Sequence, residues 1–138
     1  MLTFTILSKP CSVNKLYLQR GRYRLLSPAG RLFKLDAGTE IMAQLQHSID
    51  ADPAYLASLQ ALSGQPLTLH LAYHSATWLL KDGKSLRKKD IESYAKATND
   101  TLFSALQQYV PSLDDSQVFQ LTLEKIIDTK EYITLILS

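Results

Sequence analysis

The sequence predicts an α+β domain in which a mixed β-sheet is covered by two main helices. Strand signals and helix signals alternate along the chain without a repeat, a low-complexity tract or an interdomain linker. The 138 residues, of which 46% are hydrophobic and 20% charged, are enough for one domain with an ordinary core. Residues 1–138 are therefore expected to form a single domain.

Strands are expected where apolar or β-branched residues cluster or alternate with polar ones. The last two of these runs are separated by a short polar segment, which predicts that they pair as a hairpin. A second, smaller hairpin is expected around Gly21, where two short apolar runs flank a turn. The four main runs are residues 2–7, 67–73, 118–127 and 132–137.

Helices are expected where apolar residues recur every three to four positions. Ser27-Pro28 is typical of a helix start, and Leu35, Ile41, Met42, Leu45 and Ile49 follow at helical spacing. Asp52-Pro53 predicts the start of a second, shorter helix. The strongest pattern covers residues 90–109. The polar connector before it, residues 74–89, is expected to hold a turn at Asp82-Gly83 and a short strand at residues 78–80.

Positive charge is segregated along the chain although the net charge is only +2. Residues 9–34 carry seven basic residues and no acid, and residues 81–89 carry five more beside Asp82. This distribution favours a polyanionic partner, while solvated loops are the alternative. Tyr17 and Tyr23 are interleaved with arginines and are candidates for DNA contact.

The chain has features of a cytoplasmic protein. Cys11 is the single cysteine, which excludes an intrachain disulfide and a cysteine-based zinc site. The apolar start is too short for a signal peptide and no apolar run reaches membrane-spanning length, so no membrane association is expected. The three histidines show no ligand spacing, and neither a glycine-rich phosphate loop nor a nucleophile motif is present.

A group of acids behind the second basic stretch is the strongest functional signal. Asp90 and Glu92 begin the predicted helix of residues 90–109, Lys96 lies one turn after Glu92, and Asp115 begins the next strand. Carboxylates are the ligands that Mg²⁺ prefers, and a lysine beside them can polarise water or neutralise charge on phosphorus oxygens. The pattern indicates a metal-dependent nuclease.

Each of these acids also has an ordinary structural interpretation. Asp90 can be a helix N-cap, and Glu92 with Lys96 can form an ion pair worth about 0.2–0.5 kcal/mol. Asp114-Asp115 can be a polar turn after a helix. Both interpretations stay open at this point.

The chain resembles the RusA family of Holliday junction resolvases along most of its length. The amino-terminal part of the resemblance is Ser12-Val13-Asn14-Lys15-Leu16-Tyr17, followed by residues 27–34. The carboxy-terminal part is Arg87-Lys88-Lys89-Asp90-Ile91-Glu92-Ser93, Lys96, Asp100 and Asp114-Asp115-Ser116-Gln117-Val118. Two positions depart from the family pattern, because Glu92 and Ser93 stand where the family has Asp and Asn.

The resemblance implies a RusA-like fold, a homodimer and specific roles for site residues. Asp90, Glu92 and Asp115 would bind Mg²⁺, or Mn²⁺ in its place, and Lys96 would be the fourth catalytic residue. The expected substrate is four-way or otherwise branched DNA in recombination and repair. The alternative is a non-catalytic protein of the same fold that binds branched DNA. The residues expected to contact DNA are Asn14, Lys15, Arg20, Arg22, Arg24, Lys34, Arg87, Lys88 and Lys89.

Overall fold

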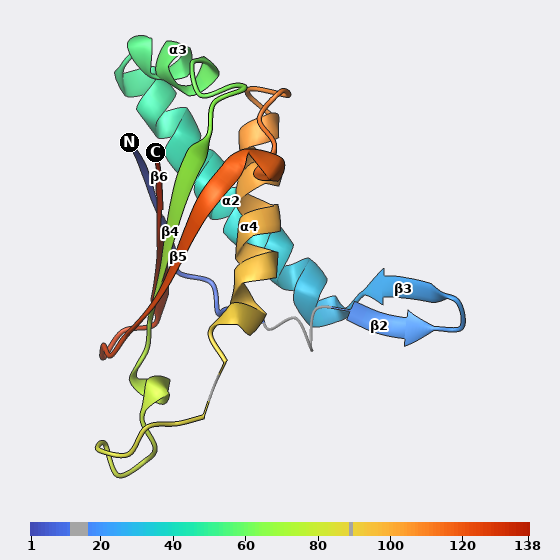
Figure 1. The fold of residues 1–138 in the computed structure, drawn as a ribbon, viewed down its shortest axis with the longest axis vertical. Helices are drawn as coiled ribbons and strands as arrows, with labels where there is room; N and C mark the ends of the chain where they lie inside the picture. The colour runs from blue at the N-terminus through green and yellow to red at the C-terminus, as the bar shows by residue number, and fades with distance from the viewer. Residues whose placement is uncertain (12–16, 89) are drawn as a thin grey trace.

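The computed structural model describes residues 1–11, 17–88 and 90–138, and it confirms an α+β architecture with a mixed sheet (Figure 1). In these residues four strands form the main sheet in the order β1-β6-β4-β5, and two more form a separate hairpin. Three α-helices accompany them in the described part of the chain: the two main helices expected and the shorter helix expected after Asp52-Pro53. The strands of the main sheet are β1 (Leu2–Ile6), β4 (Leu67–His74), β5 (Val118–Ile126) and β6 (Tyr132–Leu137).

The predicted pairing of the last two strands is wrong. β5 and β6 do not pair with each other, because β4 lies between them, parallel to β5 and antiparallel to β6. β4 carries the apolar residues Leu67, Leu69, Leu71 and Tyr73, all nearly inaccessible to solvent. In the middle of the sheet, β4 has a neighbouring strand at both of its edges. If β5 and β6 formed a hairpin with each other, β4 would lose one of these two partners.

Two long helices, α2 (Pro28–Ala51) and α4 (Glu92–Gln107), pack against one another and against the sheet. Ser27 caps α2 as predicted, with its hydroxyl accepting a hydrogen bond from the Gly30 amide at 2.9 Å. Gly38 of α2 lies close to Thr101 of α4, since a Cβ added at the glycine would stand 3.8 Å from the threonine methyl group. The third helix, α3 (Ala54–Gln60), follows Asp52-Pro53 as expected.

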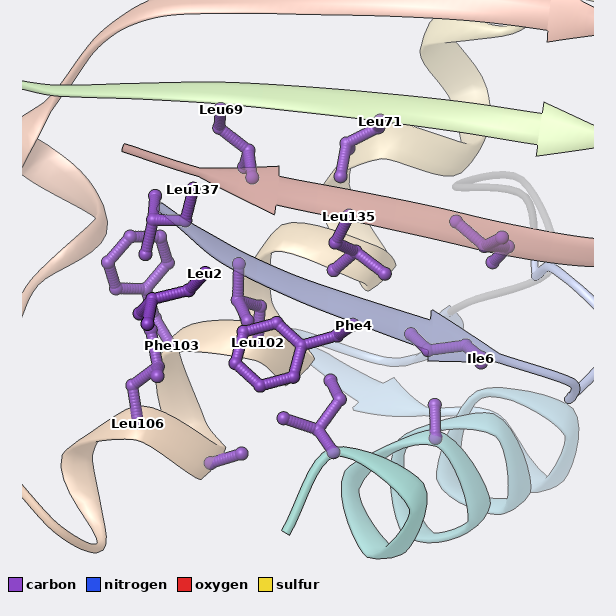
Figure 2. Packing of buried hydrophobic residues seen from close by; sticks show 14 of the residues in the cluster. Leu2, Phe4, Ile6, Leu69, Leu71, Leu102, Phe103, Leu106, Leu135 and Leu137 are labelled. Carbon is purple, nitrogen blue, oxygen red and sulfur yellow. The ribbon is translucent and has the colours of Figure 1, made fainter. Parts of the chain in front are cut away.

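The core lies between the helices and one face of the sheet, as Figure 2 shows. Leu2, Phe4 and Ile6 alternate inward along β1 with exposed threonines between them. Leu102 of α4 meets this layer and is fully buried. Leu35 is an exception to the predicted apolar stripe of α2, because 67% of its surface is exposed.

The hairpin of β2 (Tyr17–Arg20) and β3 (Tyr23–Leu26) projects away from the sheet and the helices (Figure 1). It forms around Gly21 as predicted. Gly21 has a φ of +61°, which a residue with a side chain rarely adopts. Among the described residues, no helix combines the length and the apolar character needed to cross a membrane.

The connector between β4 and α4 forms the turn that was expected but not the strand. A 3₁₀ helix (η1, Ala76–Trp78) forms where the strand was expected to begin. The reason is that the Trp78 ring is buried and its indole N–H donates to the Tyr73 carbonyl at 2.8 Å. An isolated bridge joins Leu79 to Leu86. Hydrogen bonds from Ser85 and from the Lys84 amide lower the pKa of Asp82 to about 2 and close the turn between them.

Candidate active site on α4

The first two acids of the predicted site lie at the amino end of α4, exposed to solvent. The Asp90 carboxylate accepts a hydrogen bond from the Glu92 amide at 3.0 Å, as a capping residue does. Ile91 is nevertheless the N-cap by backbone geometry, one residue later than expected. Glu92 lies in the first turn, where the helix dipole favours negative charge.

The middle of α4 carries an ion-pair cluster. Lys96 Nζ donates to Asp100 Oδ2 at 3.2 Å, and Lys34 Nζ of α2 lies 3.8 Å from the same oxygen. The hydrogen bond with Asp100 and its charge raise the pKa of Lys96, and the Tyr17 hydroxyl adds to this effect. The expected Glu92–Lys96 ion pair is wrong, because Lys96 pairs one turn further along the helix.

The chain turns back along α4 after the helix ends and brings Asp115 toward this cluster. The buried Leu113 anchors the turn, and its carbonyl accepts from Gln107 Nε2 at 2.7 Å. A hydrogen bond with Asp114, partial burial, and the charges of Asp114 and Asp100 raise the pKa of Asp115. The charge of Asp100 therefore acts on the pKa of Asp115 as well as on that of Lys96.

The pKa of the adjacent Asp114 is shifted in the opposite direction to that of Asp115. The Ser116 hydroxyl donates to its carboxylate at 2.9 Å, and this bond, with one to Asp115, lowers the pKa of Asp114. Asp114 also caps the short 3₁₀ helix η2 (Asp115–Gln117) in a capping box with Gln117. The polar-turn interpretation of Asp114-Asp115 therefore holds locally, and Asp115 is the member of the pair whose pKa the charge of Asp100 raises.

The structure does not bring the three expected metal ligands together. The eight residues of helix from Glu92 to Asp100, the acid whose charge acts on Asp115, correspond to about 12 Å along the axis. Within the described ranges, no three or more His, Cys, Asp or Glu side chains form a group that could hold a metal ion. The predicted site is thus divided between the amino end and the middle of α4.

Sequence reasoning missed that Lys34 and Asp100 are partners of one another. Lys34, one of the residues expected to contact DNA, lies 3.8 Å from the Asp100 carboxylate, across two helices. Asp100 itself was left without a role, although its spacing from Lys96 was a visible i,i+4 signal. Asn99 next to it has a buried amide oxygen that accepts no hydrogen bond from the described residues.

The remaining basic candidates are in different environments. Arg22 at the tip of the hairpin and Lys88 before α4 are exposed. Arg87 is half-buried and its Nε donates to the Thr77 carbonyl at 3.0 Å, so it helps to hold the connector. Five of the residues expected to contact DNA are not described in full: Asn14, Lys15 and Lys89 lie outside the described residues, as do the side chains of Arg20 and Arg24.

Two of the histidines pair with carboxylates on the sheet face opposite the helices. His70 Nε2 lies 2.9 Å from Glu124, which joins β4 to β5. His74 lies 3.3 Å from Asp128 and stacks on Tyr132, with ring centroids 3.9 Å apart. These contacts link neighbouring strands and are remote in sequence from the acids of α4.

No protein-family model matches the chain, and a comparison with curated proteins finds no match either. The resemblance to the RusA resolvases therefore remains an expectation carried by the residue pattern.

Proposed function

We propose that this protein is a divalent-metal-dependent endonuclease that cleaves branched DNA such as four-way junctions. The observation that carries the proposal is the set of charges around Asp100: Lys96 pairs with it at 3.2 Å, and its charge contributes to the raised pKa of Asp115. Carboxylates set among lysines suit a substrate that brings phosphates and a hard cation together. The residue pattern of the resolvase family supports the same function.

The acids fit the metal incompletely in this conformation. Mg²⁺ requires oxygen ligands at about 2.0–2.1 Å in near-octahedral geometry. Asp90, Glu92 and Asp115 do not meet at one point, so no catalytic step is assigned to an ion held by all three. When bound, the ion would supply Lewis-acid activation of water and of the scissile phosphate. The chain itself would bind DNA phosphates through exposed cations such as Arg22 and Lys88.

A second candidate is a non-catalytic protein that binds branched DNA. The divided ligand set favours it, since the described residues contain no group ready to hold a metal ion. Glu92 favours it as well, because its extra methylene displaces the carboxylate relative to the aspartate of the family pattern. A displacement of about 1 Å can cost a hundredfold in rate.

Resolution of a four-way junction needs two opposing cuts, and a homodimer with two-fold symmetry would supply two sites. The test is cleavage of a synthetic four-way junction with Mg²⁺, with Mn²⁺ and with EDTA, beside a linear duplex of the same sequence. Paired nicks in the junction that EDTA abolishes are expected. Tight junction binding without product would favour the second candidate, and equal weak binding of junction and duplex would overturn both.

Glu92→Asp separates the two candidates further. If both chains cut the junction, the natural site is an active one and the nuclease proposal stands. If cleavage arises only in the Glu92→Asp variant, the natural protein is a binder whose fold retains the rest of the site.

A further inference from the structure

The connector between β4 and α4 contains a hydrogen-bonded turn of residues 80–85, the Asp82 turn, which projects beyond the sheet and the helices (Figure 1). The Gly83 amide donates to the Leu80 carbonyl at 2.9 Å, and the Leu80 amide donates to the Ser85 carbonyl at 2.8 Å. Gly83 has a φ of +70°, a conformation that favours glycine. Although every residue of the turn is exposed, its path is therefore defined by hydrogen bonds.

The base of the turn is fixed to the main sheet. The Trp78 ring is buried, and its indole N–H donates to the Tyr73 carbonyl at 2.8 Å. The Arg87 amide donates to the Trp78 carbonyl at 2.8 Å, and Arg87 Nε donates to the Thr77 carbonyl at 3.0 Å. These bonds join both sides of the turn to the end of β4.

Both carboxylate oxygens of Asp82 are bonded within the turn. Oδ1 accepts from the Lys84 and Ser85 amides, each at 2.8 Å, and Oδ2 accepts from the Ser85 hydroxyl at 2.6 Å. An aspartate that accepts from the backbone two residues further on is a common means of stabilising a turn. In the residues that the structure describes, no cation forms a salt bridge with Asp82. Its carboxylate thus holds the turn and does not neutralise a neighbouring lysine by direct contact.

Two lysines of the turn, Lys81 and Lys84, have no partner of opposite charge in the described part of the chain. Both are exposed, and neither ammonium forms a salt bridge with a described carboxylate. Arg87 and Lys88 follow, so residues 81–88 hold four cations and one acid. A lysine ammonium binds phosphate oxygens as a point charge. The turn therefore presents positive charge from a fixed backbone, which suits a polyanion.

We propose that the Asp82 turn is a preorganised binding site for the phosphate backbone of DNA, in which Lys81 and Lys84 bind phosphates and Asp82 strengthens the binding by holding the turn. The inference rests on the DNA binding proposed above and adds an element outside the expected contacts. Lysine–phosphate contacts carry no sequence information, so the site acts on any DNA sequence. Fixing a loop in its bound conformation lowers the entropy cost of binding. This gain exceeds the repulsion between Asp82 and DNA, because solvent and salt screen an exposed charge.

The two lysines are tested by the salt dependence of DNA binding. Each contact between a lysine and a phosphate contributes about 0.9 to the slope of log K against log salt concentration. From about 50 to about 200 mM salt, the Kd of the natural chain for a labelled four-way junction should therefore rise about 12-fold more than that of the double variant Lys81→Ala/Lys84→Ala. Fluorescence anisotropy in EDTA measures binding without cleavage. Equal salt dependence of the two chains would overturn the proposal.

Lys130→Ala is the matched control for the lysine substitutions. Lys130 is exposed, and its amide also donates to an aspartate two residues earlier, Asp128, at 3.2 Å. Glu131 follows it directly, so this second turn carries two acids and one cation over residues 128–131. Its removal should leave the salt dependence of junction binding unchanged. A decrease equal to that of the double variant would show that any surface lysine has the same effect, and would overturn the proposal.

The role of Asp82 is tested by two substitutions that remove the same charge. Asp82→Asn keeps an acceptor oxygen for the Lys84 and Ser85 amides, whereas Asp82→Ala keeps none. Charge alone predicts tighter junction binding by both variants. The proposal predicts instead that Asp82→Ala binds at least about threefold more weakly than the natural chain, as when one long side chain must be ordered, and that Asp82→Asn does not. Equal binding by the two variants, or binding by Asp82→Ala as tight as that of the natural chain, would overturn it.

Failure of this inference and failure of the proposed nuclease are distinguishable. A natural chain that binds the junction through the turn but does not cut it with Mg²⁺ would support the inference and count against the nuclease alone. A natural chain that cuts the junction, while the double variant keeps the full salt dependence, would overturn the inference alone. A natural chain that binds no DNA would overturn both.

Discussion

The amino end of α4 and its middle carry acids in two different settings. Asp90 and Glu92 are exposed, and the contact of the Asp90 carboxylate is the backbone amide two residues away. Asp100 pairs with Lys96 of its own helix and with Lys34 of another helix, and its charge raises the pKa of Asp115 in the following segment. The difference shows that the sequence predicts the contacts of a carboxylate whose partners are close in the chain. The contacts of a clustered carboxylate depend instead on packing between elements.

The largest expected effect comes from the buried side of α4, which holds both regions in place. Leu102 is fully buried against the sheet. Leu102→Ala should lower the free energy of unfolding by about 2–5 kcal/mol, because it removes buried surface and leaves a cavity. Ser104→Ala on the exposed side is the control and should change it by at most about 0.5 kcal/mol. Urea denaturation measures both, and equal values would contradict this packing of α4.

A smaller effect is expected at the amino end. Asp90→Ala removes the acceptor of the Glu92 amide and should cost about 0.5–2 kcal/mol of unfolding free energy. Asp90→Asn keeps an acceptor oxygen and should lose far less. The same denaturation measurement compares them. Identical losses would mean that the charge of Asp90, rather than its capping bond, stabilises the helix.

The ion pair in the middle of α4 should contribute less again. The Lys96 side chain is 49% exposed, so solvent screens its attraction to Asp100. Lys96→Met should cost about 0.2–1 kcal/mol, and this cost should fall as salt is raised to about 1 M. A loss that salt leaves unchanged would show that packing of the lysine stem, not charge, is responsible.

The smallest expected effect is a change in the pKa of Asp115. Asp114→Asn should lower the pKa of Asp115, because it removes the hydrogen bond and charge that raise it. Carboxyl NMR titration measures this shift, with Asp128→Asn beyond β5 as a control that leaves Asp115 unchanged. In the natural chain, folding favours the protonated form of Asp115. Its contribution to stability is therefore present at low pH and is lost as the pH rises through the folded pKa.

Much of the fold follows from local patterns. The Ser27 cap, the Gly21 hairpin and the helical spacing of α4 depend on residues within a few positions of one another. The β5–β6 hairpin was predicted from a short polar loop and is wrong, because the choice of partner is made across the sheet by β4. Strand pairing over such distances is set by burial of the whole layer, which no local pattern records.

The residues of the candidate site fall into the same two groups, those predicted from local sequence and those placed by packing between elements. The cap-like bond of Asp90 and the exposure of Glu92 follow from their place at a helix start. The effect of the Asp100 charge on the pKa of Asp115 and the pairing of Lys34 with Asp100 join residues of different elements. They depend on the packing of α2 on α4 and on the turn anchored by Leu113, so spacing alone did not reveal them.

The most direct test of the account compares the two regions of α4 in one assay. Cleavage of a four-way junction with Mg²⁺ is measured for the natural chain, Asp90→Asn, Asp115→Asn and Asp100→Asn, with junction binding measured beside it. The account predicts that cleavage by the natural chain falls at least about a hundredfold in Asp90→Asn and Asp115→Asn while binding is retained. Asp100→Asn should retain most of the activity. Full cleavage by Asp90→Asn, or no cleavage by the natural chain under any metal, would contradict it.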